Sequence, residues 1–378
     1  MKVAINCWIL RNKQIDGIGY FTINAISRMI RNNPAVEFQL LCDKNFTEDY
    51  FDFPNAVKYR VFPALRHPVL YVIYMEFILP FFLWKHRPDV FLSADGFLCL
   101  STSIPQVSII YDINFEHRPQ DIALKNRLYF RFFFRKFARK AKRIATISEY
   151  SKNDIVDFYK IDPAKIDNVS CGINSNFNKL SEAEKQETRA KWSEGKPYFF
   201  FVGSMHPRKN INRLIQAFEL FKINTGADCK LLLGGAIMWM KSDIETAYTG
   251  SKFKNDILFT GRLSDQDLQS LLGASFALSF VPLFEGFGLP VVEAMSCEVP
   301  IICSNTTSLP EVAGDATLLV DPFKIEDIAA AMEKLYNDPA LCAALVEKGR
   351  LQRQKFTWDN TAKLLWNTVL SALNKNHQ

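Results

Sequence analysis

The sequence predicts an α/β protein made of two doubly wound domains. In both halves of the chain, short apolar runs alternate with segments in which apolar residues recur at helical spacing. Several of the apolar runs end at glycine. This alternation is typical of parallel sheets covered by helices. The 378 residues are enough for about two domains, each with its own core.

Composition places the chain among soluble globular proteins. Hydrophobic residues make up 48% and charged residues 23%, and the net charge of +6 is too mild to predict a nucleic-acid partner. The eight cysteines form no Cys-x-x-Cys pair, so we expect reduced core residues without disulfides or a zinc site. The chain opens directly on a strand pattern without a signal-peptide profile, which favours a cytoplasmic protein.

The apolar pattern fades near the middle of the chain and then resumes. We therefore expect an N-terminal domain over 1–176, a linker over 177–196 and a C-terminal domain over 197–355. Gly17 and Gly19 follow the first strand and open a helical pattern. They match only part of the dinucleotide-binding fingerprint, because its third glycine is missing, and an ordinary strand-to-helix turn is the alternative.

Two aromatic and basic segments follow, over 66–87 and 127–143. The first has an apolar run of 16 residues, too short for a comfortable membrane span, and the second carries eight cations and no acid. Helices packed on the sheet explain both patterns, and so does a peripheral contact with anionic lipid on the inner face of the cytoplasmic membrane.

Tyr111, Asp112 and His117 follow a buried strand of the first half, at the end where open α/β sheets bind ligands. In the second half, Gly203 ends a strongly apolar strand and is followed by Arg208 and Lys209. Two cations between a strand end and a helix start can neutralise a diphosphate.

A further strand ends in Gly261 and Arg262, and the sequence from Ser264 to Asp267 follows. Its Asp-x-Asp pattern matches a metal-binding motif, but the spacing of Ser264 and Asp267 favours the capped start of a helix. We therefore expect no metal site.

The chain is organised around the stretch from Phe284 to Met295, which lies between a buried strand and an apolar helical segment. Gly286 and Gly288 allow a sharp turn and close approach of a ligand, and Pro290 suits a first helical turn. The amides of the helix start form an anion site, and the carboxylates of Glu285 and Glu293 can each accept paired sugar hydroxyls.

The spacing of Glu285 and Glu293 around Gly286, Phe287, Gly288 and Leu289 resembles the motif of retaining, nucleotide-sugar-dependent glycosyltransferases of family 4. That resemblance implies the GT-B fold, in which two Rossmann-like domains face a central cleft. It also implies that a C-terminal helix over 358–375 packs back on the N-terminal domain.

The resemblance implies roles for these residues. Arg208 and Lys209 would stabilise charge on the diphosphate, aided by the amides of 286–289 and 17–19; Glu293 would accept ribose hydroxyls and Glu285 hydroxyls of the donor sugar. The backbone near Gly261 and Arg262 would border the nucleobase, and Gly203 would belong to the donor site. Tyr111 stands where the family has a histidine, so that role passes to Tyr111, to His117 or to neither, with Asp112 on the acceptor side.

The resulting hypothesis is transfer of a hexose such as mannose from a GDP- or UDP-linked sugar to an acceptor hydroxyl, without a cofactor. The acceptor would be a saccharide or lipid-linked saccharide of cell-surface polysaccharide synthesis. Ser204 replaces a usual arginine of the family, which keeps a non-catalytic partner subunit as an alternative. A nucleotide-sugar epimerase of the same fold is another, and a nicotinamide dehydrogenase is disfavoured by the incomplete glycine fingerprint.

Overall fold

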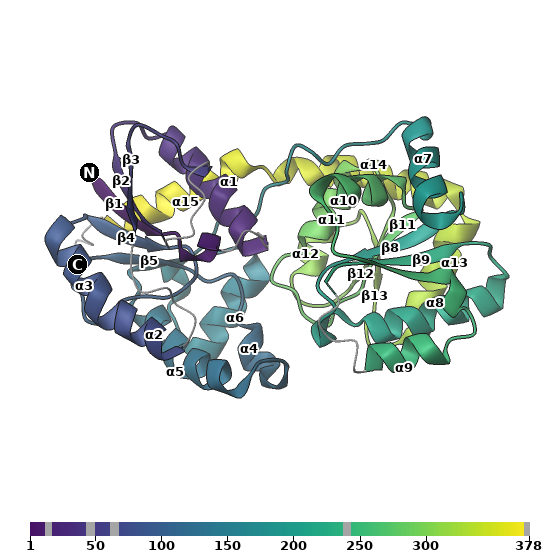
Figure 1. Cartoon of the computed structure of the whole chain (residues 1–378), viewed down its shortest axis with the longest axis horizontal. Coiled ribbons are helices and arrows are strands. Elements are labelled where there is room, and N and C mark those ends of the chain that lie inside the picture. The colour runs from purple at the N-terminus through teal and green to yellow at the C-terminus, as the bar shows by residue number, and fades with distance from the viewer. Residues whose placement is uncertain (12–16, 43–49, 61–67, 237–242, 374–378) are drawn as a thin grey trace. The chain divides into compact units, whose positions relative to one another are not determined.

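The computed structural model describes residues 1–11, 17–42, 50–60, 68–236 and 243–373. The chain divides into two compact units (Figure 1). Unit 1 comprises Met1–Gly172 and Thr357–Gln378, and unit 2 comprises Ile173–Phe356. Each unit contains one parallel sheet covered by helices, which confirms the predicted fold class.

Unit 1 has a seven-stranded sheet in the order β3-β2-β1-β4-β5-β6-β7. All neighbouring strands are parallel, as expected for near-continuous apolar strands buried on both faces. The strands are β1 (Lys2–Asn6), β2 (Glu37–Cys42), β3 (Ala56–Arg60), β4 (Val90–Ser93), β5 (Gln106–Ile109), β6 (Arg143–Thr146) and β7 (Ile166–Asn168).

Helices cover both faces of this sheet (Figure 1). One face carries α1 (Gly17–Arg31) and α15 (Trp358–Leu373), which pack on each other, and the other carries α2 (Pro68–Ile73), α3 (Leu79–His86) and α5 (Leu124–Lys140). The short α4 (Asn114–His117) and α6 (Glu149–Tyr159) complete the α-helices of the described part of the unit. Of the C-terminal helix expected over 358–375, the last two residues lie outside the described residues.

A π-helical turn, Tyr74–Ile78, joins α2 to α3. Pro80 lies in the first turn of α3 and has no N–H to donate, and the amide of Leu79 donates to the carbonyl of Tyr74 five residues earlier. The carboxylate of Glu76 accepts from the amides of Leu100 at 2.8 Å and Ser101 at 3.1 Å, so this acid faces the protein.

Unit 2 has a six-stranded parallel sheet in the order β10-β9-β8-β11-β12-β13. The strands are β8 (Tyr198–Val202), β9 (Lys230–Gly234), β10 (Ile257–Gly261), β11 (Ala277–Phe280), β12 (Ile301–Ser304) and β13 (Leu318–Val320). The helices are α7 (Glu182–Ser193), α8 (Ile211–Thr225), α9 (Asp243–Gly250), α10 (Asp265–Ala274), α11 (Leu289–Ser296), α12 (Leu309–Ala313), α13 (Ile325–Asn337) and α14 (Pro339–Gln352).

The segment 177–196, expected as a linker, belongs to unit 2 and contains α7. A capping box between Ser181 and Glu184 starts this helix. Polar contacts then hold it on α10: Arg189 donates to the carbonyl of Ala274 at 2.9 Å, and Lys191 pairs with Asp267 at 3.0 Å. Because these contacts are polar, the helix shows no apolar periodicity in the sequence. The segment was therefore predicted to be a linker.

Candidate functional site

The candidate site of unit 2 lies where its strand order reverses. From β8 the chain winds outward to β9 and β10, and from β11 it winds the other way to β12 and β13. The loops that follow β8 and β11 therefore begin side by side at the carboxyl edge of the sheet. In open α/β sheets this switch point is where ligands bind.

The loop after β8 presents the two predicted cations. Its first residue, Gly203, has φ 152°. Gly203 packs closely on Gly235, because a Cβ added to Gly235 would lie 1.8 Å from the carbonyl oxygen of Gly203. Asn210 adopts a left-handed conformation, and its side chain donates to the carbonyls of Val281 at 3.0 Å and Pro322 at 2.7 Å. The amide of Leu283 donates to the carbonyl of Arg208 at 2.7 Å. These contacts fix the loop against the one after β11.

Arg208 and Lys209 converge on one carboxylate, that of Glu285. The Arg208 guanidinium lies 2.9 Å and 3.1 Å from its two oxygens and 3.0 Å from the carbonyl of Phe284. The Lys209 ammonium also donates to Glu285 and lies 4.9 Å from the centre of the Phe280 ring. Burial alone would raise the pKa of Glu285, but the charges of Arg208 and Lys209 outweigh it and lower the pKa to about 2.

The predicted role of Glu285 differs from its contacts in this structure. We expected the carboxylate to accept hydroxyls of a donor sugar, and it accepts from the two cations instead. Arg208 and Lys209, which we expected to bind the diphosphate, are thus neutralised by Glu285, which we expected to bind the donor sugar. Glu285 and Lys209 are buried, whereas the side chain of Arg208 is 23% exposed.

Loop 284–289 leads into α11 as the glycine pattern predicted. Gly288 caps the helix with φ 106°, and a Cβ there would lie 2.5 Å from Leu309. Pro290 lies in the first turn, and the ring of Phe287 is buried against Phe356. The amides of 286–289 are therefore held at the start of an eight-residue helix.

Two hydroxyls that we had not singled out hold this loop. Ser308 donates to the carbonyls of Glu285 at 2.9 Å and Phe287 at 3.1 Å, and Thr307 accepts from the amide of Glu285 at 3.2 Å. Serine and threonine after a strand are common in turns of every kind, so the sequence alone gives no signal for this role.

Glu293 lies on α11, one turn beyond the glycine loop, and is partly buried. Among the described residues its carboxylate has no hydrogen-bond partner. Burial and, secondarily, the charge of Asp265 raise the pKa of Glu293 to about 7. A group that accepted hydroxyl hydrogens from a ligand would favour the ionised form of this acid.

Gly261 is the last residue of β10, with φ 69°, and its carbonyl accepts from the amide of Gly235 at 2.8 Å. Arg262 follows it and is exposed. Ser264 accepts from the amide of Asp267 at 3.1 Å and caps α10, which confirms the predicted helix start. Within the described ranges no cluster of three or more metal-ligating side chains occurs.

Unit 1 contains the remaining predicted residues. Gly17 and Gly19 form the first turn of α1, Gly17 exposed and Gly19 buried. The hydroxyl of Tyr111 donates to the carbonyl of Ala94 at 3.0 Å. Asp112 accepts from the backbone and side chain of Asn114, and His117 lies 2.8 Å from Asp154.

Comparison with known proteins gives two family matches. Residues 182–352 match the family described as glycosyl transferases group 1, and residues 15–177 match glycosyltransferase family 4. The chain is 33% identical to O-antigen chain mannosyltransferase B of Escherichia coli over 224 residues, 58% of each protein. It is 30% identical over 239 residues to the serotype-specific mannosyltransferase WbdA of Escherichia coli, 62% of this chain and 29% of that protein.

Among solved structures, sucrose-phosphate synthase from Thermosynechococcus elongatus has a TM-score of 0.78 at 18% identity, with 97% of each chain covered. That likeness concerns the fold. The aligned regions span little more than half of one mannosyltransferase and under a third of the other.

Proposed function

Because the chain belongs to the family 4 glycosyltransferases and has their GT-B fold, we propose that it is a retaining hexosyltransferase that uses a nucleoside diphosphate sugar. The observation that carries this proposal is the convergence of Arg208, Lys209 and Glu285 at the switch point of unit 2. Both relatives described above are called mannosyltransferases. Mannose is therefore the first donor sugar to test, as a GDP or UDP derivative.

The proposed roles follow from the contacts of Arg208, Lys209 and Glu285. The diphosphate would take over Arg208 and Lys209 from Glu285 and lie on the amides of 286–289, where a helix start favours anions. Glu285, released from its two cations, would accept hydroxyls of the sugar, and Glu293 would accept the ribose hydroxyls. Gly203, Gly261 and Arg262 complete the proposed donor site.

We propose that unit 1 carries the acceptor side of the reaction, with Tyr111, Asp112 and His117 after β5 and the start of α1 at Gly17 and Gly19. A front-face mechanism, in which the leaving phosphate helps to deprotonate the acceptor, needs no further base. The acceptor class we propose is a growing cell-surface polysaccharide or a lipid-linked saccharide.

Thermal unfolding against a panel of nucleoside diphosphates, with and without magnesium, tests the donor assignment. A ligand at about a hundred times its dissociation constant stabilises by roughly 2.7 kcal/mol. We expect one base to raise the unfolding temperature without magnesium, and the rise to disappear in Lys209→Ala. No rise with any nucleotide would overturn the proposal in favour of a non-catalytic subunit.

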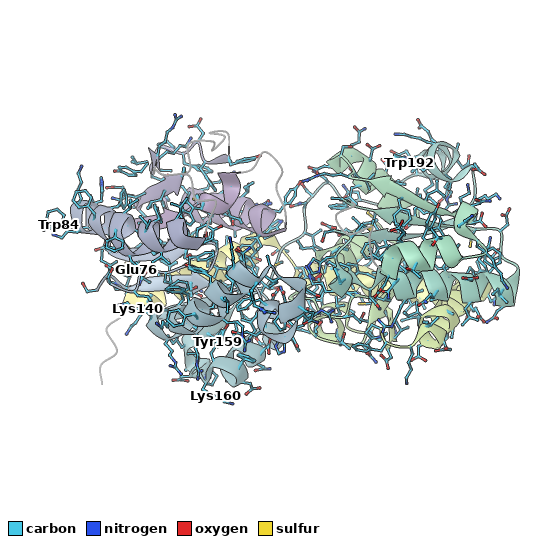
Figure 2. The ribbon with its side chains drawn as sticks, turned by 60° about the horizontal axis from the view of Figure 1, so that its bottom comes forward. Glu76, Trp84, Lys140, Tyr159, Lys160 and Trp192 are labelled. Atoms are coloured by element: carbon cyan, nitrogen blue, oxygen red, sulfur yellow. The ribbon has the colours of Figure 1, made fainter. Side chains whose placement is uncertain are left out.

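We also propose a peripheral contact between unit 1 and anionic lipid. Phe77, Phe81 and Trp84 lie at helical spacing and are 70%, 62% and 68% exposed. Figure 2 shows Trp84 at the outer edge of its unit. On α5, Leu128 and Phe132 are also exposed, and Lys136 lies 3.7 Å from the Phe132 ring centre. Within the described ranges, every helix is too short or too polar to span a membrane.

Vesicle flotation tests this contact. We expect binding to vesicles that contain phosphatidylglycerol, and loss of binding in Phe81→Ser combined with Trp84→Ser. Ile223→Ser is the matched control, because Ile223 is 54% exposed on α8 of unit 2. Equal flotation of the double variant and the control would exclude α3 as the docking element.

A further inference from the structure

The sheet of unit 1 has a switch point of its own, between β1 and β4. Its order β3-β2-β1-β4-β5 reverses direction there, as the sheet of unit 2 does between β8 and β11. Asn6 ends β1 and pairs in register with Ser93, which ends β4. Asp95 follows two residues later. None of the sequence motifs marks these residues, yet they occupy the position where open sheets bind ligands.

Asp95 is held in one orientation by three neighbours. Its Oδ1 accepts from the Asn6 amide at 3.0 Å, from the Ser93 hydroxyl at 2.8 Å and from the Phe97 amide at 3.4 Å. Its Oδ2 accepts, among the described residues, only from the Asn6 amide at 3.1 Å. Because a carboxylate oxygen can accept two hydrogens, Oδ2 retains room for a further donor.

Asn6 supplies a second acceptor. The residue is fully buried, and its Oδ1 has no hydrogen-bond partner among the described residues. A buried polar atom without a partner is costly, so a donor is expected there, either water or a ligand group. Asp95 and Asn6 thus offer two neighbouring acceptors to a molecule that carries two donors.

An aromatic cluster begins at Phe97, whose backbone amide donates to Asp95. Phe97 and Tyr71 are partly exposed, with ring centres 5.5 Å apart, and Tyr129 packs on both. Burial raises the pKa of Tyr74 and of Tyr129, and the charge of Asp95 adds to the effect on both. Tyr111 donates to the carbonyl of Ala94 and so positions the same turn from β5.

We infer that Asp95 and Asn6 form a subsite of unit 1 for the paired hydroxyls of a pyranose, against the rings of Phe97 and Tyr71. This inference rests on the proposed function and gives the acceptor a chemical class: a saccharide whose adjacent hydroxyls donate to Asp95 Oδ2 and Asn6 Oδ1. Asp95 is then a specificity-determining residue for the acceptor, and Tyr111 is a positioning residue.

Saturation-transfer NMR with methyl mannoside, glucoside and galactoside, in the presence of a bound nucleoside diphosphate, tests this subsite. We expect transfer to at least one pyranoside, and a loss of affinity of roughly tenfold to a hundredfold in Asp95→Asn, as for a hydrogen bond to a charged group. In a transfer assay with an alkyl pyranoside as acceptor, the same variant raises the KM for the acceptor more than it lowers kcat.

Ser108→Ala is the matched control. Ser108 donates to the carbonyl of Gly96 at 3.1 Å, so its loss loosens the same turn without removing an acceptor. An equal loss of pyranoside binding in this control would mean that only the turn's stability matters. If Asp95→Asn does not fold, Phe97→Leu removes the partly exposed ring but keeps the amide that holds Asp95, and it should weaken binding severalfold.

The outcomes separate this inference from the proposed function. Failure of the wild type to bind any nucleoside diphosphate overturns the proposed function. Nucleotide binding without saturation transfer to any pyranoside, or with unchanged transfer in Asp95→Asn, overturns only the subsite. In that case Asp95 has a structural role, linking β1 to β4 through Asn6 and Ser93, and water is the hydrogen-bond donor to Asn6 Oδ1.

Discussion

Replacing Glu293 by glutamine should stabilise the protein and at the same time weaken nucleotide binding. Glu293 has a pKa of about 7 in the folded protein, against an ordinary value of 4.5. Below pH 4.5 the group is protonated in both states and contributes nothing. As the pH rises from 4.5 to 7, the unfolded chain loses this proton first, so the folded state becomes relatively less stable.

The size of the effect follows from the shift. A pKa of about 7 instead of 4.5 corresponds to a cost of about 3 kcal/mol at pH 8 and of only about 1 kcal/mol at pH 5. Glu293 is partly exposed, so solvent screening makes these figures upper bounds. Glutamine fills the same space without a charge to bury. We therefore expect a gain for Glu293→Gln that is larger at pH 8 than at pH 5.

Urea unfolding at the two pH values measures this gain. Glu187→Gln is the control, since Glu187 is exposed on α7 of the same unit. Calorimetric titration of the wild type in buffers of different ionisation enthalpy tests the role of Glu293 in nucleotide binding. Ribose hydroxyls that donate to Glu293 should expel about one proton per nucleotide near pH 6. A variant no more stable than the control at pH 8, or binding without proton release, would refute this account of Glu293.

Three further predictions concern the site of unit 2. Lys209→Ala should lower turnover by roughly two or more orders of magnitude while circular dichroism stays unchanged, since it removes charge stabilisation of the diphosphate; rates near those of the wild type would contradict the role. Glu285→Ala should cost about 3–5 kcal/mol in urea unfolding, because it leaves two cations without their counter-charge. As Glu285 has a depressed pKa of about 2, its contribution is present above pH 4.5 and disappears as the pH falls towards 2, so wild type and variant should converge in acid. Gly288→Ala should cost about 1–3 kcal/mol, because alanine meets Leu309 and a left-handed backbone; an unchanged unfolding midpoint would show that the loop relaxes.

The strands, the glycine turn and the capped start of α10 were predictable because each leaves a local pattern. Gly288 and Pro290 are two residues apart, and Ser264 and Asp267 are three apart, so chain geometry alone links them. The position of Arg208 and Lys209 at the end of β8 was likewise readable from the apolar strand before them.

Contacts between distant segments were not predictable in this way. Asn6 and Asp95 are 89 residues apart and meet only because β1 and β4 are neighbours in the sheet. The pairing of Glu285 with both cations depends in the same way on β8 lying beside β11. Strand order is decided by the packing of whole helices and strands, and no short motif in the sequence encodes it.

The path of the chain through unit 1 has a consequence for its biosynthesis. The chain leaves this unit at Gly172 and returns at Thr357, and a Cβ on Gly172 would lie 2.3 Å from the Trp358 amide nitrogen. Trp358 packs on Phe21 of α1, and Trp366 packs on Phe38 of β2. The ribosome therefore makes the last piece of unit 1 only after the whole of unit 2. Until α15 emerges, the nascent unit 1 exposes the apolar surface of α1, whereas unit 2 is continuous and can fold first.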